Sequence, residues 1–204
     1  MTDPALQEAE RALKAGRRRM LLVMVGSALA ALVALVVYMA SGDDEAVARF
    51  GRSVNGLDMD HFKAFWGCAL PGANLKEIRT NEDLERQIHL RAEERPQAYG
   101  RHLRDKCLGK LAEMPGKLRA LIPPEGFDQP LQGMERPPAA AMADAVERLG
   151  GAVGDFASYL SELEGGYDRE MGAEKVQPIA RAWYDYRVAL AAVNRAIKER
   201  KGGS

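Results

Sequence analysis

The chain has few cysteines, few histidines and no excess of charge of either sign. Two cysteines and three histidines occur among 204 residues, and 29 basic side chains balance 29 acidic ones. A neutral chain lacks the basic surface that neutralises phosphates, which argues against a nucleic-acid-binding protein. The spacings Cys-x-x-Cys, Cys-x-x-Cys-His and His-x-x-x-His are also missing. We therefore expect no zinc site, no covalently held haem and no other cofactor.

Motifs of hydrolases and nucleotide-binding enzymes are missing as well. The chain contains no Gly-x-Ser-x-Gly, no phosphate-binding glycine loop and no His-Glu-x-x-His. Its carboxylates fall on the polar faces of amphipathic segments, where solvated charge is the usual arrangement. The sequence therefore predicts a protein that is not an enzyme.

The clearest feature that is present is one long apolar run. Residues 20–40 contain no charged side chain across 21 positions. A helix of that length spans about 30 Å, the thickness of the hydrocarbon core of a bilayer. Three arginines, residues 17–19, precede the run, and three acidic residues, 43–45, follow it. Because basic flanks stay in the cytoplasm, the pattern predicts an uncleaved signal-anchor in the cytoplasmic (inner) membrane, with the N-terminus inside.

A cleaved signal peptide is the main alternative for this segment. The apolar run is longer than the usual 7–15 residues or so, and 19 residues precede it. Tyr38 also stands two positions before Ala40, where a cleavage site requires a small residue.

Within the run, Gly26, Ala30 and Ala34 recur every four residues, a spacing that lets two membrane helices approach closely. These three residues are candidates for a homodimer contact through the transmembrane helix.

The rest of the chain predicts an all-α domain outside the membrane. No segment alternates convincingly between apolar and polar residues as a strand does, whereas helical spacing recurs in several stretches. The length suffices for one hydrophobic core. We predict a cytoplasmic tail, a transmembrane helix, a linker and a periplasmic helical bundle over residues 1–19, 20–40, 41–57 and 58–204. The helical stretches of the bundle are residues 58–67, 80–121, 138–163 and 173–200.

Prolines and heptad spacing refine the helices. Thr80 begins a capping sequence, Pro96 divides the long stretch that follows, and Pro115-Gly116 interrupts it again. The last two stretches have apolar residues at alternating spacings of four and three. This pattern predicts an antiparallel, heptad-like helical hairpin at the C-terminus, joined by residues 165–172.

Cys68 and Cys107 are predicted to form a disulfide. Both follow the membrane span, where an oxidising compartment lets disulfides form and persist, and an even count leaves no thiol over. Cys107 lies on the apolar stripe of its helix, and Cys68 ends a helix whose aromatic face turns inward. The alternatives are two unpaired core cysteines and a reactive or metal-binding thiol. Reactivity is disfavoured for Cys68, which is at the wrong end of its helix, although Arg104 and Lys106 flank Cys107.

A proline-rich connector is the main candidate for binding a partner. Residues 123–138 hold five prolines, and loops this long inside compact domains are often functional. Its large apolar residues Phe127, Leu131 and Met134 have no helical periodicity that would bury them. We predict that they contact a partner together with Tyr184, the surface residue of an aromatic stretch in the last helix. The alternative is that the connector folds back on the bundle as a lid.

Three functions are compatible with these features. The leading hypothesis is a single-pass membrane protein whose bundle is an interaction or scaffolding module, an accessory subunit of an envelope complex. Its partners are then the membrane and another envelope protein. A ligand-binding sensory bundle is the alternative, with a small molecule held in the bundle core. A metal or thiol-redox protein is a third hypothesis, which the missing motifs disfavour.

Overall fold

The computed structural model describes residues 45–73, 78 and 80–202 of the chain. The predicted cytoplasmic tail and transmembrane span, with Gly26, Ala30 and Ala34, lie outside these residues. No helix in the described part is long and apolar enough to cross a membrane. Every regular element of that part is a helix, which confirms the all-α prediction.

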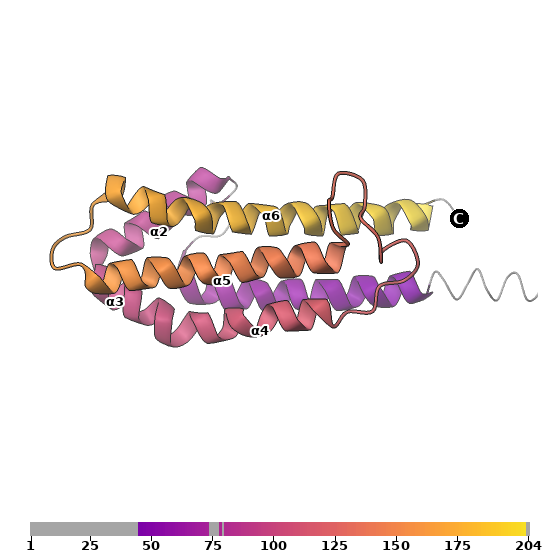
Figure 1. The fold of residues 1–204 in the computed structure, drawn as a ribbon, viewed down its shortest axis with the longest axis horizontal. Coiled ribbons are helices and arrows are strands. Elements are labelled where there is room, and N and C mark those ends of the chain that lie inside the picture. Colours follow the sequence, from indigo (N-terminus) through magenta and orange to yellow (C-terminus); the bar gives the residue numbers. More distant parts are fainter. Residues whose placement is uncertain (1–44, 74–77, 79, 203–204) are drawn as a thin grey trace, which may run out of the picture. The chain divides into compact units, whose positions relative to one another are not determined.

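The described helices form a bundle in which α5 is central. Helix α5 packs chiefly against α6 and α4, and α6 runs antiparallel beside it, so the predicted hairpin is confirmed (Figure 1). A helix over residues 45–69 lies along the same bundle (Figure 1). The remaining elements, in chain order, are α2 Asn81–Glu94, α3 Pro96–His102, a π-helical segment Leu103–Cys107, α4 Leu108–Arg119, α5 Pro138–Glu162 and α6 Arg169–Gly202.

The predicted linker differs from the structure. Residues 45–57 are helical and continue without a break into the predicted first helix of the bundle. The cause is a stripe of side chains at spacings of three and four, which is the pattern that buries one helix face. The stripe is buried except at Leu57, which is half-buried, and it consists of Val47, Phe50, Val54, Leu57, His61, Phe65 and Cys68.

The expected helix boundaries are met at two positions and missed at a third. Thr80 caps α2, since its hydroxyl accepts from the Asp83 amide at 3.2 Å and the Asp83 carboxylate accepts from the Thr80 amide at 3.1 Å. Pro96 begins α3 after a break at Arg95. The predicted interruption at Pro115-Gly116 is wrong, because α4 continues through Pro115. The buried face of α4 against α5 outweighs the one backbone hydrogen bond that proline removes.

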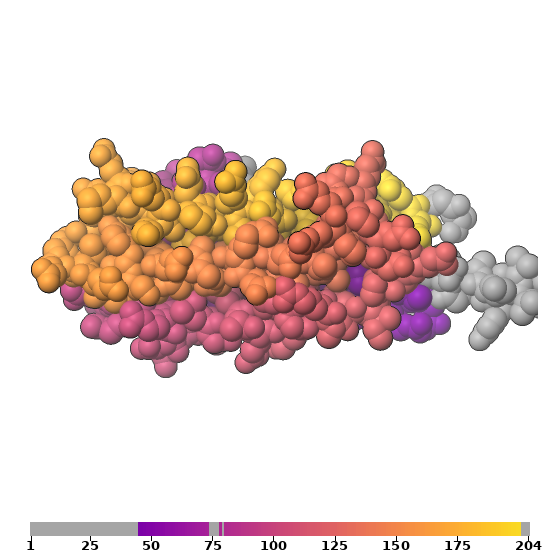
Figure 2. Space-filling view, in the orientation of Figure 1, coloured from indigo at the N-terminus to yellow at the C-terminus, as the bar shows by residue number. Residues whose placement is uncertain are grey.

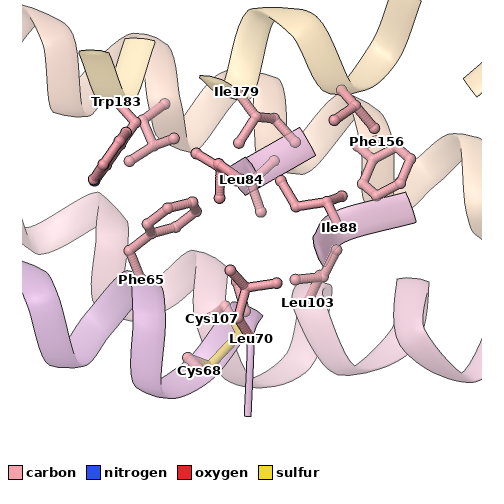
Figure 3. Close-up of a cluster of buried hydrophobic side chains, with 14 of the residues drawn as sticks. Phe65, Cys68, Leu70, Leu84, Ile88, Leu103, Cys107, Phe156, Ile179 and Trp183 are labelled. Carbon is pink, nitrogen blue, oxygen red and sulfur yellow. A yellow bond between two sulfur atoms is a disulfide. The ribbon is translucent and has the colours of Figure 1, made fainter. Parts of the chain in front are cut away.

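The buried side chains fall into two clusters along the bundle. One, which we call the disulfide cluster, surrounds Cys68 and Cys107 and includes Phe65, Leu84 and Trp183 (Figure 3). The other, the connector cluster, brings the start of the 45–69 helix together with α4, α5, α6 and the connector. The two clusters place the cysteines and the connector in different parts of the core.

Candidate functional site

The two cysteines are paired in the core, as predicted. Their Cα atoms are 5.6 Å apart, and the pair joins the end of the 45–69 helix to the π-helical segment, 39 residues later in the chain (Figure 3). Cys107 is fully buried and Cys68 is 5% exposed. The pair therefore links two helices through the core rather than lying at the surface.

Two side chains tie the same helix end by hydrogen bonds. The Tyr99 hydroxyl donates to the Ala69 carbonyl at 2.7 Å, and Nε2 of His102 donates to the Cys68 carbonyl at 2.8 Å. The last carbonyls of a helix have no partner within it, so these donors act as a C-terminal cap. Burial raises the pKa of Tyr99 above its usual value, which keeps its proton in place. The cysteine pair, Tyr99 and His102 thus hold one helix terminus together.

In the described part of the chain, one cluster has metal-ligand spacing, and it consists of Cys68, His102 and Cys107. A ligand atom from each of Cys68, His102 and Cys107 lies within 4.8 Å of the others. Zinc and similar ions bind cysteine as a thiolate, and sulfurs bonded to each other offer none. With the cysteines joined, the cluster is a covalent cross-link supported by a helix cap.

The structure corrects the role predicted for Phe127. This side chain is 1% exposed, so it is a lid on the connector cluster and is not presented to a partner. Its ring packs 5.3 Å from the ring of Phe50, and the guanidinium of Arg200 covers it. Gly126, at φ +81, forms the turn that aims Phe127 inward, and the Phe127 amide closes that turn on the Pro124 carbonyl at 3.0 Å.

Two of the other candidates line one groove. Met134 from the connector and Tyr184 from α6 both face an open groove of about 740 Å³ between the connector, α5 and α6. A second glycine turn, with Gly133 at φ +82, positions Met134, which is half-buried. Tyr184 is 54% exposed, and Val188, one turn further along α6, is 44% exposed. Figure 2 shows the connector raised beside α6 on the face that carries α5 and α6. Leu131 packs against the connector cluster and is not part of the groove.

Two ion pairs join charged side chains of the groove. Arg136 contacts Asp144 at 2.6 Å, and Arg148 contacts Asp185 at 2.9 Å. Hydrogen bonds from Arg119 and then Arg136 lower the pKa of Asp144, so its carboxylate stays charged. The groove thus combines these ion pairs and Glu135 with the apolar surface of Tyr184, Val188 and Met134.

A further polar residue in the core was missed by the sequence analysis. His61 is 2% exposed, and neither of its ring nitrogens has a hydrogen-bond partner. Its ring is parallel to that of Phe65 at 6.4 Å and lies 4.3 Å from the ring of Tyr186. The signal was its place on the heptad stripe of the 45–69 helix. Burial lowers the pKa of His61 from 6.5 to about 4, so the imidazole is neutral at physiological pH.

We expect His61 to make the domain sensitive to acid. Between its ordinary pKa of 6.5 and about 4, the unfolded chain binds a proton that the folded chain does not. The free energy of unfolding therefore has its full value above about pH 6.5. It decreases by about 3 kcal/mol in total as the pH falls to about 4. His61→Phe keeps a ring of similar size and removes the titration. Urea unfolding between about pH 7 and about pH 4 should therefore show that the stability of the variant increases relative to that of the natural chain as the pH falls. A difference that stays constant over this range would contradict the assignment.

Comparisons with protein-family models, with curated proteins and with solved structures found no match for this chain.

Proposed function

We propose that the chain is a single-pass protein of the cytoplasmic membrane whose helical bundle, outside the membrane, is an interaction module in an envelope complex. The apolar run over residues 20–40 supplies the anchor, with the N-terminus in the cytoplasm and the domain in the periplasm. Self-association through Gly26, Ala30 and Ala34 is part of this proposal.

The observation that carries the interaction role is the groove beside Tyr184. It brings two residues far apart in sequence, Met134 and Tyr184, to one surface and leaves Tyr184 and Val188 substantially exposed. Aromatic and methionine side chains are enriched at protein interfaces, and charged residues that are already paired contribute little by themselves. The partner is accordingly a protein that inserts an apolar side chain or helix face between the connector and α6.

A crosslinking experiment tests the groove directly. A photoreactive amino acid at position 184 or 188 of the full chain should yield a discrete adduct with another protein in cells. The same group at Met171 is the matched control, because Met171 lies on α6 outside the groove and is 62% exposed. Adducts that are equally abundant from all three positions would show that the groove is not the contact.

Val188→Asp should separate binding from folding. A charge on the wall of the groove should reduce the adduct from position 184 by about tenfold or more. Since Val188 is partly exposed, the melting temperature should change by no more than about 2 °C. An undiminished adduct from a folded variant would place the partner elsewhere.

A further inference from the structure

A second opening, which we call the α2–α6 hollow, lies next to the groove at Tyr184. Its volume is about 850 Å³, and Tyr184 and Asp185 line both the hollow and the groove. Helix α2 packs against α6 in this region, so two helices form the walls of the hollow (Figure 1). The exposed ring of Tyr184 is therefore shared by two neighbouring openings on the surface of the bundle.

Acidic side chains dominate the lining of the α2–α6 hollow. Its charged residues are Glu82, Glu85, Glu174, Asp185 and Arg181. Asp185 is paired with Arg148 at 2.9 Å, whereas no ion pair to the other three carboxylates occurs within the described residues. Four carboxylates and these two guanidinium groups leave an excess of two negative charges. Arg187 stacks over Trp183 and lines a neighbouring hollow, and the balance stays negative even when its charge is added.

The carboxyl group of Glu85 shows the effect of this excess charge. The side chain is half-buried, and burial together with the charge of Glu82 raises the pKa of Glu85 above its usual value. A nearby cation stabilises a carboxylate that is partly removed from water and lies beside a like charge. A positive group that enters the hollow therefore gains from charges that the domain itself leaves uncompensated.

The spacing of these carboxylates favours an organic cation over a metal ion. A metal ion needs its ligand atoms close around one point, and no group of three acidic side chains among the described residues meets that spacing. Ammonium and guanidinium groups carry several N–H donors and can reach carboxylates that lie apart. The ring of Tyr184 adds a favourable surface, since the face of an aromatic ring attracts cations. The lining thus matches the side chain of a lysine or an arginine.

We propose that the protein partner presents a basic amphipathic helix to α6, with an apolar side chain in the groove and a lysine or arginine in the α2–α6 hollow. The inference rests on the interaction role proposed above and adds the chemistry of the partner. The apolar side chain lies against Met134 and Val188, and the cation lies among Glu85, Glu174 and Tyr184. Because the two openings share Tyr184, residues on one face of a single helix supply both groups.

Two peptides of opposite charge test this chemistry. The first is a fluorescent, alanine-based helical peptide of about 15 residues, with leucine and arginine on one face. In the second, every arginine is replaced by glutamate. Fluorescence anisotropy with the full chain in a nonionic detergent should show that the basic peptide binds with a Kd of about 100 μM or tighter and the acidic peptide at least about tenfold more weakly. Empty micelles give the background, and higher salt should weaken the binding because it screens exposed charges.

Neutral variants assign the binding to the hollow. The double change Glu85→Gln and Glu174→Gln should raise the Kd of the basic peptide by about tenfold, since it removes two unpaired carboxylates and keeps the shape of the side chains. Glu170→Gln with Glu199→Gln is the matched control. Both of these residues are exposed on α6 and line neither opening, so the Kd should stay unchanged. Circular dichroism checks that each variant is folded.

Three results with the peptides would overturn the proposal. Equal affinity for the two peptides would show that the partner is not selected by its charge. An unchanged Kd in the variant at Glu85 and Glu174 would place the basic peptide elsewhere on the chain. Loss of binding when about 5 mM Mg²⁺ is added at constant ionic strength would assign the hollow to a metal ion instead.

The crosslink in cells separates this inference from the interaction role on which it rests. In the full chain with a photoreactive group at position 184, the double variant at Glu85 and Glu174 should reduce the adduct by about tenfold. An adduct at full yield would keep the interaction role and contradict a basic partner. No adduct from the natural side chains at these two positions would contradict the interaction role itself.

Discussion

Replacing Phe127 with Ala should lower the free energy of unfolding by about 3–5 kcal/mol, although Phe127 lies in a proline-rich connector rather than in a helix. The ring is fully enclosed between Phe50, Arg200 and the rest of the connector cluster. Its removal leaves a cavity that a connector held by two glycine turns and several prolines cannot easily close. Urea unfolding of the full chain in detergent, followed by circular dichroism, measures the loss.

Ile122 provides the matched control for this experiment. It is a large apolar residue of the same connector region but is 90% exposed. Ile122→Ala should therefore change the stability by no more than about 0.5 kcal/mol. If Phe127→Ala costs no more than Ile122→Ala, the connector does not close the core, and Phe127 is again a candidate for contact with a partner.

The helices that could be predicted are those with an unbroken apolar stripe. In α5 and α6 the heptad positions that define the stripe are the buried ones, from Met142 to Leu160 and from Val176 to Val193, with only Leu190 half-buried. The first helix carries a comparable stripe but begins earlier than predicted. Gly51 and Gly56 each lower its intrinsic helix propensity by about 1 kcal/mol. Burial of Val47, Phe50 and Val54 outweighs that cost. Helix propensity does not include this contribution, so it predicts a later start for the helix.

The π-helical segment left a signal in the sequence that ordinary helical spacing does not explain. Tyr99, Leu103, Cys107 and Leu111 are buried and follow one another at intervals of four. In an α-helix each such interval rotates the side chain by about 40° away from the previous one. Wider turns at Leu103–Cys107 reduce this drift and keep Cys107 directed at the core. A run of fours therefore indicated a local change of helix type.

The groove depends on a contact that sequence spacing cannot supply. It needs Gly133 in a left-handed conformation to bring Met134 beside α6. The exposure of Tyr184 could be predicted, because its neighbours Trp183 and Tyr186 occupy the heptad positions. The burial of Phe127 could not, since a turn rather than a helical period directs its side chain inward.

Loss of the cysteine pair should lower the free energy of unfolding by about 4 kcal/mol in the chain-entropy model, because the bond closes a loop spanning a sequence separation of 39. Simultaneous Cys68→Ala and Cys107→Ala changes test this without burying a new hydroxyl group. The Tyr99 and His102 hydrogen bonds to the end of the 45–69 helix do not involve sulfur and should persist. We therefore expect a folded but less stable domain, as measured by urea unfolding under oxidising conditions.

The same cysteines test the proposed location of the domain outside the cytoplasm. A disulfide persists outside the cytoplasm, whereas cytoplasmic reductants keep thiols free. Alkylation of the full chain in intact cells, followed by non-reducing mass analysis, should find no free thiol and one peptide linking Cys68 to Cys107. A reduced pair buried in the core would still pack well as two small apolar residues. Two free thiols, with no stability lost in the double alanine variant, would therefore leave the fold intact and remove the support for a periplasmic domain.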